Sequence, residues 1–141
     1  MSSTRHRILI IEDATGVANM YKDILSDEYD ITICHSGEKV QSLINQHEEF
    51  DLAVVDIVLP PEEKTLTLSD CQRTGLRLMA EMIREKVCSR FYVITVLKDL
   101  RPDVEMLCQQ AHAVVKFQYK LDSEPEELKD TIRCLLEQEV A

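Results

Sequence analysis

The chain has 141 residues, of which 26 are acidic and 16 are basic, so its formal net charge at pH 7 is −10. This length is typical of one domain, and the negative charge argues against non-specific binding to nucleic acid or to anionic lipid. No apolar run approaches the roughly 20 residues of a membrane span, and the first residues lack the apolar region of a signal peptide. The five cysteines form no CxxC pair, so they predict free, mostly buried thiols in a cytosolic protein.

Short β-branched runs alternate with helical periodicity along the whole chain. In chain order, the predicted elements are a strand at 7–12, a helix through 17–25, a strand at 30–35, a helix after Ser36, a strand at 52–56, a helix through 76–83, a strand at 91–96, a helix through 104–111, a strand at 113–116 and a helix through 128–136. This strict alternation predicts a doubly wound α/β fold, in which helices cover both faces of a parallel sheet.

Polar residues stand at the ends of four predicted strands. Glu12 and Asp13 end the first, Asp56 the third, Thr95 lies near the end of the fourth, and Lys116 ends the fifth. Each alone could be a cap, a turn residue or a solvated charge. Because sites in such sheets lie where the strands end, the set together favours one functional site.

These residue types suit phosphoryl chemistry. Clustered carboxylates repel unless a cation joins them, and hard oxygen ligands favour Mg²⁺. A carboxylate held beside Mg²⁺ can attack a phosphoryl group, while a lysine and a hydroxyl contact the phosphoryl oxygens. The predicted chemistry is therefore positioning and electrostatic stabilisation of phosphoryl transfer.

Several motifs in this order resemble the receiver domain of bacterial two-component response regulators. They are Ile10-Ile11-Glu12-Asp13, Asp51-Leu52-Ala53-Val54-Val55-Asp56 followed by Leu59-Pro60, Ile94-Thr95, and Val114-Val115-Lys116. The resemblance covers nearly the whole chain and implies a flavodoxin-like, five-stranded parallel sheet of order 2-1-3-4-5 with five helices. We expect a single receiver domain over residues 1–141, without an effector domain and located in the cytoplasm.

The resemblance also implies a role for each site residue. Asp56 would be the phosphoacceptor, and Mg²⁺ would be bound by Glu12, Asp13, Asp56 and the backbone carbonyl of Val58. Thr95 would be the switch hydroxyl, and Lys116 would contact the phosphate. The implied protein is a phosphorelay component and not an enzyme, beyond self-catalysed phosphorylation and dephosphorylation. A sensor histidine kinase or phosphotransfer protein would act upstream and an unknown protein effector downstream, with no nucleic-acid or membrane partner.

Four features depart from the family pattern. Phe117 follows the lysine in place of proline, Ala113 stands where an aromatic switch residue is usual, and Val96 replaces the small residue after the threonine. Phe117 or Tyr119 could substitute for the missing aromatic. The segment 60–75 is longer than in most family members, and its Leu66 and Leu68 could dock on a partner or over the phosphosite.

These departures leave alternatives to the phosphorylated receiver. One is a receiver-like interaction module that works without phosphorylation. An aspartyl-phosphate phosphatase of the haloacid dehalogenase type would resemble Asp-x-Asp at 56–58, but Val58 lacks the acid/base group. A flavodoxin-type flavin carrier would need a hydroxyl- and Gly-rich loop after the first strand, where acids here would repel phosphate.

Overall fold

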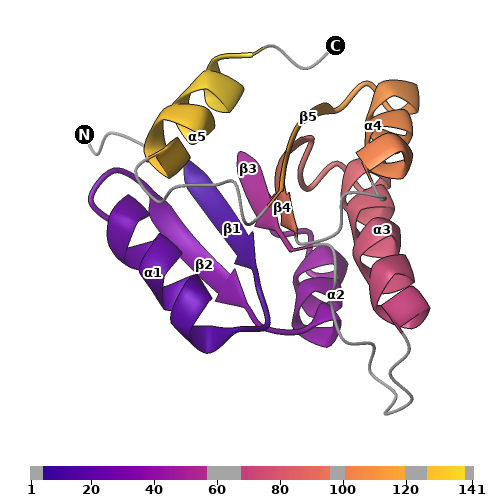
Figure 1. Cartoon of the computed structure of the whole chain (residues 1–141), viewed down its shortest axis with the longest axis horizontal. Helices are drawn as coiled ribbons and strands as arrows, with labels where there is room; N and C mark the ends of the chain where they lie inside the picture. Colours follow the sequence, from indigo (N-terminus) through magenta and orange to yellow (C-terminus); the bar gives the residue numbers. More distant parts are fainter. Residues whose placement is uncertain (1–4, 57–67, 96–100, 120–126, 139–141) are drawn as a thin grey trace.

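The computed structural model describes residues 5–56, 68–95, 101–119 and 127–138, without the side chains of 68–74 and 119. In this part of the chain, five strands alternate with five helices (Figure 1). The elements are β1 (Arg7–Ile11), α1 (Thr15–Leu25), β2 (Asp30–Cys34), α2 (Gly37–Asn45), β3 (Leu52–Val55), α3 (Leu68–Arg84), β4 (Arg90–Thr95), α4 (Arg101–Gln110), β5 (Val114–Tyr119) and α5 (Glu127–Glu137).

The strands form one parallel sheet of order β2-β1-β3-β4-β5, which confirms the predicted fold class and strand order. Helices α1 and α5 cover one face of this sheet, and α2, α3 and α4 cover the other (Figure 1). All five strands therefore end at the same edge, called here the carboxyl edge. A helix of every βα unit begins near that edge and returns the chain to the opposite one.

Strands such as β1 are continuous apolar runs because both faces of the sheet are buried. Along β1, Ile8 and Ile10 point toward α1 and α5, whereas Leu9 and Ile11 pack on the side of α2, α3 and α4. Successive side chains of a strand point to opposite faces, so a continuous apolar run is what a doubly covered strand requires. The two resulting hydrophobic clusters hold the sheet in place.

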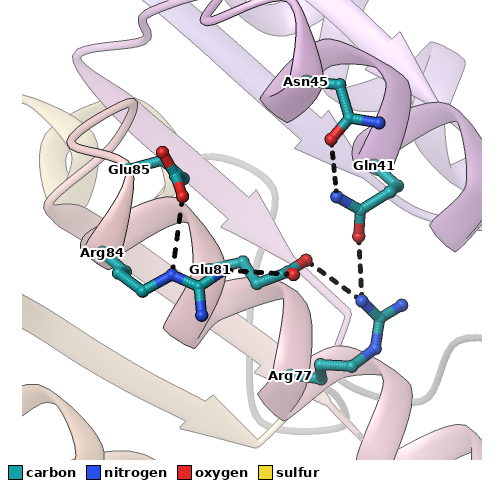
Figure 2. Close-up of polar contacts among 6 residues, drawn as sticks. All are labelled: Gln41, Asn45, Arg77, Glu81, Arg84 and Glu85. Atoms are coloured by element: carbon teal, nitrogen blue, oxygen red, sulfur yellow. Dashed lines mark hydrogen bonds and ion pairs between the residues drawn. The ribbon is translucent and has the colours of Figure 1, made fainter.

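Polar contacts join α2 to α3 (Figure 2). Arg77 of α3 donates to Gln41 Oε1 of α2 at 2.8 Å and to Glu81 Oε2 of its own helix at 3.0 Å. Gln41 donates to Asn45 Oδ1 at 3.0 Å, and Arg84 lies 3.5 Å from the carboxylate of Glu81. Of these contacts, the hydrogen bond from Arg77 to Gln41 crosses between the helices, and exposed pairs of this kind add little to the free energy of unfolding.

The structure corrects two predicted boundaries. The fifth strand was predicted to end at Lys116, but β5 continues to Tyr119 because Phe117 enters the hydrophobic cluster and Tyr119 pairs with Thr95. The helix predicted through 76–83 begins earlier, because residues 68–75 of the segment 60–75 form the first turns of α3, so Leu68 is the first helical residue. Gly75 lies inside this helix, where an isolated glycine is tolerated. Leu66 lies outside the described residues.

Other expectations can be compared with the described residues directly. Cys34, Cys88 and Cys108 are free and buried, as predicted, whereas Cys134 is free and exposed. The peptide bond between Lys116 and Phe117 is trans. Among the described helices, none has both the length and the apolar character to cross a bilayer.

Candidate functional site

Three carboxylates gather at the carboxyl edge. Glu12 and Asp13 follow β1, and Asp56 follows β3, the neighbouring strand in which Val55 pairs with Ile11. One carboxylate oxygen from each of the three residues lies within 4.8 Å of the others. The structure therefore brings together the three side chains that the sequence predicts as metal ligands.

Backbone hydrogen bonds fix the segments that carry these acids. The Asp56 N–H donates to Ile11 O at 2.9 Å, and the Glu12 N–H donates to Cys34 O at 3.1 Å. Glu12 is only 2% exposed, and its Oε2 accepts the N–H of Ala14 at 3.3 Å. Asp13 is exposed. The cluster thus has an inner carboxylate held by the backbone and an outer one that faces solvent.

The donor set fits a hard divalent cation. Two like charges about 4–5 Å apart repel by about 1 kcal/mol in water and about 4 kcal/mol near a protein surface, so three carboxylates this close favour a cation between them. Mg²⁺ is bound by one or a few carboxylates together with carbonyl oxygen and water. Glu12, Asp13 and Asp56 supply such oxygens, whereas Val58 lies outside the described residues.

The predicted hydroxyl and ammonium groups lie at different heights along the sheet. Thr95 is the last residue of β4 and is fully buried. Lys116 is exposed, and its strand partner is Tyr92, three residues before Thr95. Strand β5 continues for three residues beyond Lys116, so that Tyr119 and not Lys116 pairs with Thr95. The Cα of Lys116 lies about 7 Å short of Asp56 along the strands and about 10 Å away across two strand spacings. The lysine must therefore extend toward the carboxyl edge to contact a group on Asp56.

Two residues that depart from the family pattern, Ala113 and Phe117, lie on the α4 side of the sheet. Ala113 precedes β5 and packs against the cluster beneath α2, α3 and α4. Phe117 is buried in that cluster and pairs with Val93, which shares a strand face with Thr95. An aromatic ring thus lies two residues from the level of Thr95, on the same face. Val96 and the Tyr119 side chain lie outside the described part.

One residue at the carboxyl edge was missed by the sequence analysis. His35 follows β2, and its Nδ1 lies 3.0 Å from the backbone oxygen of Glu12. The same strand-end rule that selected the acids could have selected it, because a polar residue directly after β2 reaches the same edge.

A hollow of about 730 Å³ lies at the opposite edge of the sheet, where β1 and β4 begin. It is lined by Arg5, Arg7, Glu49, Phe50, Asp51, Lys86, Val87, Cys88, Ser89 and Arg90. The Arg7 guanidinium lies 3.1 Å from Glu48 Oε2, and Arg5 lies 3.7 Å from Asp30 Oδ1, so part of this positive charge is already paired. None of the predicted site residues is among the lining residues, so the hollow is separate from the acidic cluster.

Comparison with known proteins identifies solved structures that are similar to this fold. No protein-family model and no curated protein sequence matches the chain. A CheY-like response regulator receiver domain from Methanospirillum hungatei JF-1 is 24% identical, with 94% of each chain covered and a TM-score of 0.71. Response regulator TrrA from Thermotoga maritima, solved with Mg²⁺ and BeF, is 23% identical, with 92% of this chain and 98% of that chain covered and a TM-score of 0.66.

A third similar structure is the BeF3-activated N-terminal receiver domain of RstA from Klebsiella pneumoniae. It is 20% identical, with 94% of this chain and 99% of that chain covered and a TM-score of 0.66. These matches span most of each chain, so the protein has the fold of response regulator receiver domains, as the sequence resemblance predicted.

Proposed function

We propose that this protein is a signalling receiver that accepts a phosphoryl group on Asp56 and passes the signal on by contact with another protein. The observation that carries the proposal is the gathering of three carboxylates at the carboxyl edge of a receiver fold. Upstream we place a sensor histidine kinase or a phosphotransfer protein, and we place the exchange in the cytoplasm.

In the proposed reaction, a carboxylate oxygen of Asp56 attacks the phosphorus atom of the donor. The new O–P bond forms as the bond between phosphorus and the donor's histidine nitrogen breaks, and that bond's electron pair stays on the nitrogen. Glu12, Asp13, Asp56 and the Val58 carbonyl would bind Mg²⁺. The ion, when bound, neutralises charge on the carboxylates and on the phosphoryl oxygens.

Two further side chains act on the phosphoryl group in this proposal. The Thr95 hydroxyl, at the end of the neighbouring strand, would donate a hydrogen bond to one of its oxygens. Lys116 would supply a positive charge, which requires its side chain to extend along the sheet from the level of Tyr92. Apart from forming and losing its own phosphoryl group, the protein is not proposed to act as an enzyme.

The position of Lys116 favours a second candidate function. Because the strand partner of Lys116 is Tyr92 and not Thr95, the Cα atom of this lysine lies further from Asp56 than that of a residue at the end of β5. A receiver-like interaction module that works without phosphorylation needs no such lysine contact. The two functions differ in whether Asp56 accepts a phosphoryl group.

Intact-mass measurement after incubation with Mg²⁺ and acetyl phosphate separates the two candidates. Wild type should gain the mass of one phosphoryl group, and Asp56→Asn should gain none. Asp23→Asn, on the exposed face of α1, is the matched control and should be labelled like wild type. Labelling of Asp56→Asn equal to wild type would remove Asp56 from its role, and absent labelling of the folded wild type would favour the unphosphorylated module.

A further inference from the structure

His35 and Glu12 make a contact that no role described so far explains. The Nδ1 atom of His35 lies 3.0 Å from the backbone oxygen of Glu12, and this contact is partly buried. A carbonyl oxygen only accepts hydrogen bonds, so Nδ1 carries the proton and donates it. The imidazole is thereby fixed against the backbone of the acidic cluster.

The path of the chain explains why a side chain makes this bond. The β1–β2 ladder ends at the pair Ile11 and Cys34, and the Glu12 N–H still donates to Cys34 O. Ser36 then caps α2 by accepting the Lys39 N–H, so strand β2 does not continue beside Glu12. The His35 ring supplies the donor that a longer strand would have supplied from its backbone.

Holding the Glu12 carbonyl also fixes Asp13. The carbonyl of Glu12 and the N and Cα atoms of Asp13 belong to one planar peptide unit, which turns as a rigid body. The next turn of the chain is held as well, because Glu12 Oε2 accepts the Ala14 N–H at 3.3 Å. Because one contact holds the peptide unit before Asp13 and the other holds the peptide unit after it, the direction in which the exposed Asp13 carboxylate leaves the backbone is fixed too.

We propose that His35 is a positioning residue for the acidic cluster: its ring holds the Glu12 carbonyl and so directs the Asp13 carboxylate toward Glu12 and Asp56. The inference rests on the proposed Mg²⁺ site. Residues that hydrogen-bond to metal ligands orient these ligands without contacting the ion. Their removal commonly lowers metal affinity by one order of magnitude or more.

Mg²⁺ titration of the folded protein, followed by amide NMR shifts at low temperature, tests this assignment. His35→Ala should weaken Mg²⁺ binding roughly tenfold, because the peptide plane before Asp13 is released. His35→Asn keeps a short N–H donor and should recover most of the affinity. His47→Ala is the matched control, since His47 lies past the end of α2 at the opposite edge, and it should bind like wild type.

The outcomes separate this inference from the proposed function. If wild type binds Mg²⁺ and His35→Ala binds it equally well, the positioning role is wrong and the metal site stands. If His35→Ala and His35→Asn lose the same affinity, the carbonyl contact is not what matters and the inference is overturned. If folded wild type binds no Mg²⁺, the metal site of the proposed function is overturned together with the inference.

Discussion

Asp13 is the exposed member of the carboxylate cluster, and its charge is the easiest to remove without disturbing the core. We expect Asp13→Asn to raise the free energy of unfolding of the metal-free protein by about 0.5–1 kcal/mol, because one repelling charge is lost. The same variant should bind Mg²⁺ more weakly and accept a phosphoryl group more slowly. Urea unfolding in EDTA and an Mg²⁺ titration measure the two effects.

Asp23→Asn is the control, because Asp23 is an exposed aspartate of α1 outside the cluster. It should change neither quantity. An unchanged Mg²⁺ affinity in Asp13→Asn would remove Asp13 from the set of metal ligands.

The cysteines differ sharply in reactivity. Burial raises the pKa of Cys34 and of Cys108 to about 11, and that of Cys88 to about 12. Only the thiolate reacts with alkylating agents, and a thiol with a pKa near 11 is about 0.1% ionised at pH 8. Among the cysteines whose side chains are described, iodoacetamide at pH 8 should therefore label the exposed Cys134 first.

Peptide mapping after timed labelling checks this order, and unfolding in urea provides the control in which all the thiols should react. Fast labelling of Cys34 in the folded protein would mean that the carboxyl edge beside β2 opens more readily than its burial implies.

The acids of the site were predictable from the sequence because Glu12 and Asp56 each follow an apolar run directly, and Asp13 comes next after Glu12. A strand that is buried on both faces leaves a sharp boundary where polar residues begin. The position of His35 at the end of a strand could be recognised from the sequence, but its bond to a backbone carbonyl of another strand could not. Such a contact depends on where β2 ends and α2 begins, which the pattern of residue types does not specify.

Three helices end in the same strained way. His47, Lys86 and His112 have positive φ angles of 55°, 59° and 57°, where glycine is the usual residue. At α4, the His112 N–H donates to Gln109 O, and the Ala113 N–H donates to Cys108 O, the paired bonds that close such a helix end. Each of the three side chains therefore occupies a backbone conformation that costs about 1–2 kcal/mol.

We expect His112→Gly to raise the free energy of unfolding by about 0.5–1 kcal/mol, because relief of this conformation outweighs the extra freedom of glycine in the unfolded chain. The same change three residues earlier, Gln109→Gly, lies inside α4 and should lower it by about 1 kcal/mol. Urea unfolding of the two variants measures the opposite signs. Destabilisation by both would show that the His112 side chain makes a contact worth more than the strain.

Element boundaries were less predictable than the elements themselves. The apolar run Val114 and Val115 identifies β5, but its extension depends on Phe117 fitting into the cluster beneath α4. The early start of α3 was missed because its first turns combine polar residues with Gly75. Local sequence gives the type of such elements, whereas tertiary packing decides where they stop.

At the scale of the whole molecule, topology was predictable because it follows from few rules. Five alternating βα units with right-handed crossovers predict a doubly wound sheet. The resemblance to receiver domains implied the strand order, and the structure confirms it. The same topology directs the amino-terminal ends of the helices toward the edge that carries the acids. A charge added at Asp56 therefore acts on more than its immediate neighbours.

This arrangement predicts which segment changes its hydrogen exchange most when Asp56 carries a phosphoryl group. The phosphoryl group adds a charge of about −1.5 to −2, which interacts favourably with a helix amino terminus and repels acids such as Glu62 and Glu63, which follow Asp56 in the sequence. Helix α3 begins at Leu68, directly after the segment that leaves Asp56. Hydrogen exchange over residues 60–75 should therefore change more than in α1 or α5 when wild type binds the phosphoryl mimic beryllofluoride, with slower exchange in the first turns of α3.

Mass spectrometry of exchanged peptides measures this response, and Asp56→Asn with beryllofluoride is the control, which should show no change. If exchange over residues 60–75 is identical in both states while another surface responds, the segment is only a tolerated insertion. In that case shortening the part of the segment that precedes α3 should leave phosphoryl labelling and partner binding intact, because the closure entropy of a loop changes only slowly with its length. If the prediction holds, the same shortening should abolish the response at the start of α3 while Asp56 is still labelled, which would separate acceptance of the signal from its transmission.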